Sequence, residues 1–393
     1  MYPDASRLRI AFLSYGFGEY SVRHANALAE VADVLLMLPE DIAAEHRDKL
    51  STKVELFAFA GPRLRQPLRQ FGAARKILNR LDAYEPSVLH LQAGHLWFNC
   101  ALAVARRWPL VVTIHNPRHH VGDRSSRRTP QCMLDYGYRR ADHVIVHGDQ
   151  LKAETVEQLG IATEKIHVVP HIAMGEMPQD MPPVEEDSSL VLFFGRIWEY
   201  KGLRYLIEAE PLISEAVPNL RIMIAGRGDN FEKYRRLMVH PDRFLVENEY
   251  VSETRRYEMF SQAALVVLPY IEATQSGVVP VAYTHGKAVV ATRVGALPEC
   301  VDDGDTGLLV PPRDVKALAD AIVQLLTDPQ RRRTMGHNGR RKLEQECSDG
   351  IVAHAHLDAY QRAIESHEAN RKERRRTVTT KRRQPSATQA VRP

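Results

Sequence analysis

The sequence predicts an α/β protein with two doubly wound domains, each built on a parallel sheet, that face each other across a central cleft. Short apolar runs alternate with amphipathic stretches. The alternation stops at a segment without pattern and then restarts. The length of 393 residues is too great for one ordinary core. Runs that are apolar throughout, separated by helices, indicate strands of parallel sheets covered on both faces.

The first domain is expected to be Rossmann-like and to span residues 1–175. Strands are expected at residues 8–14, 33–38, 54–60, 88–93, 110–115 and 143–148. The stretches 21–30 and 95–107 have the amphipathic pattern of helices between these strands. Residues 176–188, rich in proline and acidic residues, then form a linker.

The second domain, residues 189–347, is expected to repeat this architecture. Strands are expected at residues 190–195, 220–226, 265–269, 288–292 and 307–312, with helices at 314–327 and 329–346. A further helix at 350–365 belongs to a C-terminal segment, 348–368, that we expect to return to the first domain. Residues 369–393 lack apolar periodicity, so they are expected to form a disordered basic tail.

The basic character of the chain comes from this tail. The net charge is +4, but nine Lys or Arg and a single acid follow residue 370, so the first 370 residues carry −4. A solvated tail is the expected role, and nucleic acid is not an expected partner. No apolar run reaches the roughly 18 residues of a membrane span, and the N-terminus lacks a signal-peptide pattern, so a cytoplasmic location is expected.

Ligands of doubly wound sheets bind beyond the carboxyl ends of the strands, which selects the loops where a site should be assembled. These loops are 15–19, 115–123, 195–201, 226–230 and 272–277. Arg196 follows one strand and Lys201 precedes the next helix, so two cations can meet a diphosphate without a metal ion. Taken as an isolated pair, both could equally be solvated surface charges.

The loop 272–277 leaves its strand through small polar residues. If the next helix begins near Ser276, backbone N–H groups point outward and a phosphate or sugar can approach closely. An ordinary helix cap explains Thr274 and Ser276 equally well when they are taken alone. His115, at another strand end, could donate to a sugar hydroxyl or stabilise developing charge, although the chain has 17 histidines.

No metal site is expected. The adjacent His119 and His120 lack the spacing of a helical zinc pair, and the cysteines lack CxxC spacing, so neither metal ligation nor disulfides are predicted. Gly16 and Gly18 form a GxG without a third glycine. This pattern indicates a loop that leaves space for a ligand more than a dinucleotide site.

Four segments together resemble the retaining glycosyltransferases of family 4, which have the GT-B fold. They are "FFGRIWEYKGLRYLIEA", "IMIAGRGDN", "LPYIEATQSGVVPVAYTHGKAVVATRVGALPECVDDGDTGLLVPP" and "VIVHGDQLKAETVEQLGIATEKIHVVPHI". By this resemblance Arg196 and Lys201 would hold the donor diphosphate, and His115 would lie near the donor sugar. The candidate donor-binding residues are Gly16, Gly195, Gly228, Glu272, Thr274, Gln275, Ser276 and Gly277.

The chain departs from the family in one motif. The family often carries two glutamates separated by seven residues, and the matching positions here are Ala273 and Val281, with Glu272 one place away. We therefore expect a variant site in which residues 275–277 contact sugar or phosphate.

The resemblance implies transfer of a sugar from a nucleoside diphosphate sugar to an acceptor hydroxyl with retention of configuration, in polysaccharide or glycoconjugate biosynthesis. It implies no cofactor and no metal. The acceptor would be a sugar or a lipid-linked molecule. The basic stretch 63–81 could touch an anionic surface at the inner membrane face, but Pro67 and Gly72 interrupt its pattern and an ordinary solvated face is the expected explanation. A nucleotide-sugar epimerase of similar fold and a non-catalytic protein that binds nucleotides or polyanions are the alternatives.

Overall fold

The computed structural model describes residues 7–92, 95–101, 107–120, 129–176, 181–228 and 230–383, with side chains as far as residue 376. Seven apolar segments of the N-terminal half form one parallel sheet in the order β3-β2-β1-β4-β5-β6-β7. Their bounds are β1 Arg9–Leu13, β2 Asp33–Pro39, β3 Val54–Phe59, β4 Val88–Leu91, β5 Leu110–Thr113, β6 His143–Val146 and β7 Ile166–Val168.

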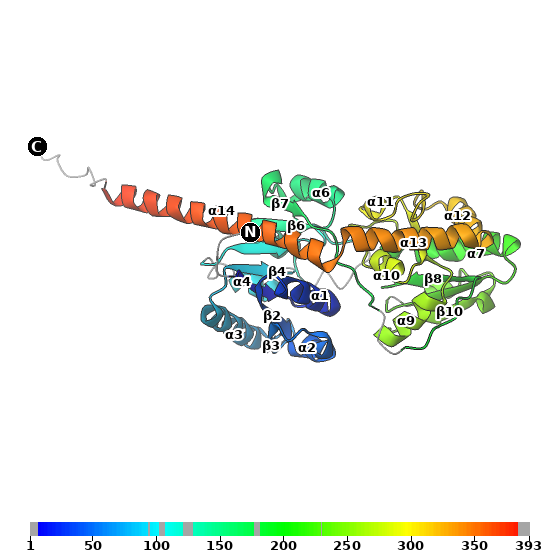
Figure 1. Ribbon diagram of the computed structural model, residues 1–393, viewed down its shortest axis with the longest axis horizontal. Helices are drawn as coiled ribbons and strands as arrows, with labels where there is room; N and C mark the ends of the chain where they lie inside the picture. Colours follow the sequence, from blue (N-terminus) through cyan, green and yellow to red (C-terminus); the bar gives the residue numbers. More distant parts are fainter. Residues whose placement is uncertain are drawn as a thin grey trace, which may run out of the picture.

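Helices cover both faces of this sheet. On one face lie α1 and the C-terminal helix α14, and on the other lie the helices α3 to α6 (Figure 1). The helices of this half are α1 Gly18–Ala29, α2 Glu40–Glu45, α3 Pro67–Tyr84, α4 Leu96–Ala101, α5 Gln131–Arg140 and α6 Asp149–Leu159, with one-turn helices η1 Arg47–Lys49 and η3 Thr163–Lys165. The predicted helix 95–107 corresponds to α4, and residues 102–106 of it lie outside the described residues.

The second half forms a six-stranded parallel sheet in the order β10-β9-β8-β11-β12-β13. Its strands are β8 Leu190–Phe194, β9 Arg221–Ala225, β10 Phe244–Glu247, β11 Leu265–Leu268, β12 Ala288–Thr292 and β13 Gly307–Val310. Its helices are α7 Leu203–Ala216, α8 Glu232–Arg235, α9 Glu253–Gln262, α10 Val278–Thr284, α11 Leu297–Cys300, α12 Val315–Thr327 and α13 Pro329–Glu346, with η4 Glu199–Lys201 and η5 Pro241–Arg243.

Both sheets confirm the predicted α/β class. Sequence analysis missed β7 and β10, each of which is one of the two edge strands of its sheet. Both strands are short and only partly buried, so they lack the continuous apolar runs of the central strands. In each sheet the winding reverses beside the first strand, between β1 and β4 and between β8 and β11, which is where such sheets bind ligands.

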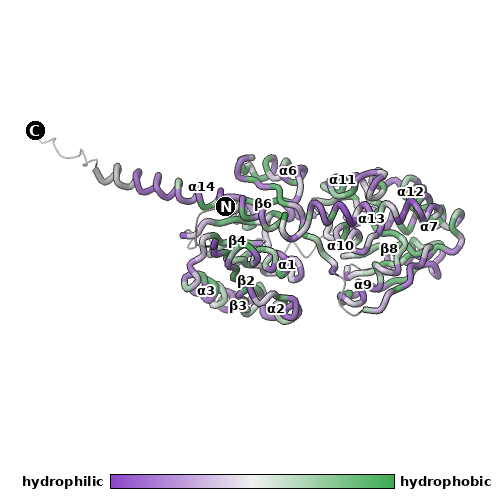
Figure 2. Tube along the Cα trace, in the orientation of Figure 1, coloured by the Kyte–Doolittle hydropathy of each residue, from purple (hydrophilic) through white to green (hydrophobic). Residues whose placement is uncertain are grey.

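The C-terminal helix α14, Asp349–Arg383, joins the two halves a second time. After α13 the chain crosses to the N-terminal half, where α14 packs against α1 and the strands β4, β5 and β6 (Figure 1). Its residues in this core are Val352, Ala353, Ala359, Tyr360 and Ala363. The helix then continues past the end of that domain, and this outer part is mostly hydrophilic (Figure 2). The prediction of a disordered tail from residue 369 is therefore wrong for residues 369–383, where the run of Arg and Lys continues the helix. Residues 384–393 lie outside the described residues.

In the part of the chain that the structure describes, no helix is both long enough and apolar enough to cross a membrane.

Candidate active site

A cleft of about 410 Å³ lies between the two sheets at the carboxyl ends of their strands. The N-terminal half lines it with the loop after β1, the start of α1, the loop after β5 and the segment that follows β7. The C-terminal half lines it with the loop after β8, the loop after β11 and α9. The lining residues are Phe17, Gly18, Glu19, Tyr20, His115, Asn116, His120, His171, Met174, Phe194, Gly195, Arg196, Tyr200, Lys201, Arg256, Thr274, Gln275, Ser276, Gly277, Val278 and Val281.

Arg196 and Lys201 stand on the same wall of this cleft. The Lys201 side chain is only 9% exposed, and its Nζ lies 3.7 Å above the centre of the Tyr270 ring. Such a cation–π contact helps to hold a buried ammonium group. Arg196 is exposed and extends its Nη2 to within 3.5 Å of the Tyr200 hydroxyl. The wall therefore offers one fixed cation and one that can reach a ligand from the rim.

Gly202 explains how Lys201 is directed into the cleft. Its φ is +65°, and a Cβ there would lie 1.8 Å from the carbonyl oxygen of Pro269. Only glycine fits this close approach, because any side chain would clash with the backbone that follows β11. The tight turn ends η4 at Lys201 and starts α7 at Leu203.

The loop 272–277 bridges the two walls. The Gln275 side-chain amide forms a hydrogen bond with His115 Nδ1 over 2.9 Å, and the Thr274 hydroxyl donates to the Asn116 amide oxygen. The Ser276 hydroxyl accepts from the backbone N–H of Val278 at 3.3 Å. The helix α10 begins at Val278, two residues later than predicted, so the small polar residues form the loop itself and not the first turn of the helix.

His115 is a neutral imidazole held between two glutamines. Burial, together with the neighbouring His171 ring, lowers the pKa of His115 to about 3. Gln92 Nε2 lies 2.7 Å from its Nε2, and the amide oxygens of Gln92 and Gln275 are both buried without a hydrogen-bond partner among the described residues. A neutral ring has one donor and one acceptor, so one of the two amides presents its oxygen to the ring.

Phe17 was not among the predicted site residues. It adopts a left-handed backbone with φ 55° and ψ 50°, which is uncommon for a bulky residue, and its ring stacks on His115 with 4.5 Å between ring centres. Its side chain is half exposed. The strand-end rule had selected its loop, 15–19, but not this residue, since a backbone of positive φ at a non-glycine residue is not visible in the sequence.

Three predicted residues do not line the cleft. Gly16 precedes it in the loop after β1, with open space where a Cβ would lie. Gly228 packs its backbone against Ile197, where a Cβ would meet the carbonyl oxygen at 2.2 Å. The Glu272 side chain is 43% exposed, and its Oε2 lies 3.7 Å from Nδ1 of His120, which does line the cleft. Gly16, Gly228 and Glu272 therefore lie next to the cleft and outside its lining.

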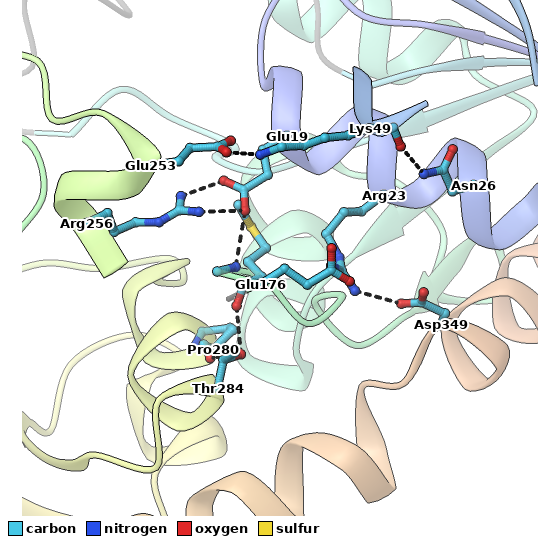
Figure 3. Close-up of polar contacts among 12 residues, drawn as sticks. Glu19, Arg23, Asn26, Lys49, Glu176, Glu253, Arg256, Pro280, Thr284 and Asp349 are labelled. Atoms are coloured by element: carbon cyan, nitrogen blue, oxygen red, sulfur yellow. Dashed lines mark hydrogen bonds and ion pairs between the residues drawn. The ribbon is translucent and has the colours of Figure 1, made fainter. Parts of the chain in front are cut away.

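An ion pair across the cleft was also not predicted. Arg256 of α9 binds the Glu19 carboxylate of α1 through both of its terminal nitrogens, at 2.6 and 3.1 Å (Figure 3). Burial would raise the pKa of Glu19, but the hydrogen bond and charge of Arg256 outweigh it, and the pKa is lowered. The backbone N–H of Gly175 donates to the same carboxylate at 3.1 Å. We call Glu19 and Arg256 the clasp.

Further polar contacts flank the clasp. Lys49 pairs with Glu253 between the two halves, and Arg23 of α1 binds Glu176 of the linker at 2.5 Å and Asp349 of α14 at 3.2 Å (Figure 3). The helix α1 therefore contacts the opposite domain through Glu19 in its first turn. One turn later, Arg23 contacts both connections between the domains, the linker and the start of α14.

The geometry of two facing parallel sheets with a cleft between them defines a protein of GT-B architecture, and comparisons with known proteins agree. The family model described as "Glycosyltransferase Family 4" matches residues 16–172, and the one described as "Glycosyl transferases group 1" matches residues 188–328. Together they span well over half of the chain. Both descriptions are of glycosyltransferases, and the two matches support a glycosyltransferase of the family 4 type, which favours glycosyl transfer over the epimerase and polyanion-binding alternatives.

Individual relatives are distant. The chain is 29% identical over 332 residues to the D-inositol 3-phosphate glycosyltransferase of Kribbella flavida, covering 75% of this chain and 76% of that protein. Sucrose-phosphate synthase of Thermosynechococcus elongatus shares the fold with a TM-score of 0.72 and 19% identity, covering 92% of this chain and 100% of that one. HepE of Anabaena in complex with UDP-glucose gives a TM-score of 0.66 and 18% identity, with coverages of 92% and 100%.

Proposed function

We propose that this glycosyltransferase moves a sugar from a nucleoside diphosphate sugar to an acceptor hydroxyl with retention of anomeric configuration. The observation that carries the proposal is the placement of Arg196 and Lys201 on one wall of a cleft whose other wall holds His115. The small loop 274–277 lies between them and leaves room for a phosphate or a sugar. The structure of Anabaena HepE with UDP-glucose supports a donor of the same class.

The two cations supply the charge that a diphosphate requires. Charge-assisted hydrogen bonds contribute roughly 1.5 to 3 kcal/mol each, so Arg196 and Lys201 can bind the diphosphate with no metal ion. Their contribution grows as the bond between the sugar and the phosphate breaks, because negative charge then accumulates on the leaving oxygen. Stabilisation of that developing charge is the main catalytic effect that we assign to them.

Among the described residues that line the cleft, the only carboxylate is that of Glu19, and Arg256 already binds it. His115 has a pKa of about 3, so it is a poor proton acceptor at neutral pH. We therefore propose that the acceptor hydroxyl gives its proton to the departing phosphate oxygen. The new bond to the anomeric carbon then forms on the face that the phosphate leaves, and this accounts for retention.

His115 and Gln275 are assigned to the donor sugar. The neutral ring can offer one N–H or one lone pair to a hydroxyl once the Gln275 amide releases it. The acceptor would approach from the N-terminal half and would be a sugar or a lipid-linked molecule of polysaccharide or glycoconjugate biosynthesis.

A thermal-shift titration tests the donor site. UDP, GDP, ADP and their sugar conjugates are titrated against wild type, Arg196→Ala/Lys201→Ala and the charge-matched control Arg235→Ala/Arg236→Ala. One nucleotide should raise the Tm of wild type and control but not of the site variant, since only ligands that bind the native state stabilise it. Equal shifts in all three proteins, or none at millimolar nucleotide, would refute the diphosphate site.

Product analysis tests the reaction itself. With the donor so identified, NMR of the product formed on a soluble acceptor should show the donor's anomeric configuration. Inversion would exclude the proposed mechanism, and conversion of donor without acceptor into an isomeric nucleotide sugar would indicate an epimerase.

A further inference from the structure

Two large apolar side chains in the first turns of α3 are exposed to solvent. Leu68 is 87% exposed and Phe71 is 72% exposed, the highest values for large hydrophobic residues among the described residues. They stand three residues apart on one helix, so their side chains lie together on one face. The rest of the helix uses Ala73, Ala74, Ile77 and Leu81 to pack on the sheet.

A cationic cavity adjoins this apolar pair. It has a volume of about 650 Å³ and lies between the start of α3 and the loop that follows β3. Its lining residues are Glu40, Ala60, Gly61, Pro62, Arg63, Gln66, Arg69, Gly72, Ala73 and Lys76. On α3 the residues Arg69, Gly72, Ala73 and Lys76 follow a helical spacing, so they form a stripe beside the one that holds Leu68 and Phe71. Gly72 has open space where a Cβ would lie, which keeps the cavity wide.

The charge of this surface is not balanced internally. Arg63, Arg65, Arg69, Arg75 and Lys76 are all exposed, and none of them has an ion-pair partner among the described residues. Glu40 is the one acid among the described residues that line the cavity. Elsewhere on α3, Arg80 pairs with Glu55 of β3, so the excess of positive charge is concentrated at the start of the helix.

We propose that this surface, defined by Leu68, Phe71 and the cavity lined by Arg63, Arg69 and Lys76, docks the N-terminal domain on a bilayer of anionic phospholipid. Lipid phosphates would enter the cavity, and Leu68 and Phe71 would insert among the acyl chains. Side chains that are both apolar and fully exposed favour hydrocarbon over the hydrated backbone of nucleic acid. Each cation near an anionic surface strengthens binding about fivefold, or about 1 kcal/mol.

The location of the surface suits the reaction. The loop 60–66 follows β3 at the carboxyl edge of the N-terminal sheet, the same edge from which His115 reaches the cleft. A docked N-terminal domain would therefore hold this edge near the membrane surface. The inference deepens the proposed function by assigning the acceptor to the membrane, and it depends on that function only for the role of the bound lipid.

Vesicle co-sedimentation of the full chain tests the surface. Wild type, Arg69→Glu/Lys76→Glu and Leu68→Ser/Phe71→Ser are compared on phosphatidylcholine vesicles with and without 30% phosphatidylserine. We expect wild type to bind the anionic vesicles, the charge variant to bind them at least about 30-fold more weakly, and the apolar variant at least about tenfold more weakly. The matched controls Arg235→Glu/Arg236→Glu and Leu212→Ser/Val239→Ser change exposed residues of the other domain and should bind like wild type.

A second measurement separates this surface from the basic end of α14, which can also attract anionic lipid. The variant Phe71→Trp should show a blue shift and quenching by brominated lipid on anionic vesicles, whereas Val239→Trp should show neither. Absence of quenching at residue 71, or α3 variants that bind like wild type, would overturn the proposal. Binding of inorganic phosphate without vesicle binding would also overturn it, in favour of a soluble phosphorylated ligand. Because lipid binding is read without donor, failure here leaves the nucleotide titration unaffected.

Discussion

The clasp between Glu19 and Arg256 should set the balance between closed and open arrangements of the two domains. The side chains are 16% and 13% exposed, and two charged hydrogen bonds join them. Removing one partner of a largely buried pair costs up to 3–5 kcal/mol. Because both side chains keep some solvent contact, about 2 kcal/mol is the expected loss for Arg256→Ala. A loss of 2 kcal/mol shifts the closed-to-open ratio by about 30-fold.

Small-angle X-ray scattering of the free protein, nucleotide Kd and kcat/KM together measure this shift. Arg256→Ala should increase the radius of gyration and lower kcat/KM, while Glu19→Gln should have a smaller effect because it still accepts from Gly175. The neighbouring Arg255→Ala is the matched control, since Arg255 pairs only with Glu247 and Glu258 of its own domain among the described residues. A double-mutant cycle should give a coupling above 1 kcal/mol.

The pH dependence of the clasp follows from the lowered pKa of Glu19. At pH values above the usual pKa of glutamate, the Glu19 carboxylate is ionised in the folded protein. The contribution of the clasp to the stability of the closed arrangement is therefore constant at neutral pH. It is lost only as the pH falls through the lowered pKa of Glu19 in the folded protein.

A coupling energy between Glu19 and Arg256 below 0.5 kcal/mol, or unchanged scattering and kinetics in Arg256→Ala, would refute the reasoning.

Three further variants test the site and the fold. Lys201→Ala should lower kcat at least tenfold, about 1.4 kcal/mol, while the exposed control Lys316→Ala should not, as steady-state kinetics will show. Burial lowers the pKa of His356 to about 4, so the unfolded chain takes up a proton below about pH 6.5 that the folded chain does not. This residue therefore contributes up to about 1.4 kcal/mol per pH unit to the loss of stability as the pH drops. The variant His356→Phe should make the fall of the urea-unfolding free energy between pH 7 and 5 less steep; a curve parallel to that of wild type would contradict this. Gly202→Ala should lower the Tm and weaken nucleotide binding because its Cβ meets backbone, whereas Gly350→Ala, which meets open space, should do neither; equal behaviour of the two would disprove the steric argument.

The sequence was sufficient to predict the parts of the site that depend on a single domain. Loops after parallel strands meet at one edge of a sheet, and this rule brought Arg196 and Lys201 to one wall, His115 to the other and the loop 274–277 between them. The side chain types were then enough to suggest a diphosphate site. Gly228 illustrates the limit, because a glycine after a strand serves a close backbone contact as readily as a ligand.

The parts that could not be predicted depend on how the two domains meet. Glu19 and Arg256 lie 237 residues apart and look like ordinary surface charges on amphipathic helices. The hydrophobic periodicity of helices and strands does not predict how one sheet is oriented relative to the other. The outer part of α14 was missed for a different reason, since its composition of Arg and Lys is typical of solvated segments whether or not they are helical.

The second crossing of the chain makes the C-terminal domain, residues 189–347, an insertion within the N-terminal domain. The described part of residues 7–175 leaves one face of β4, β5 and β6 uncovered unless Val352, Tyr360 and their neighbours on α14 return to it. A fragment that stops before α14 would therefore expose apolar surface and should aggregate. A chimera that exchanges nucleotide specificity between relatives must be cut at two places, in the linker and at the junction of α13 with α14. Recombination at a single site would separate the N-terminal domain from part of its own core.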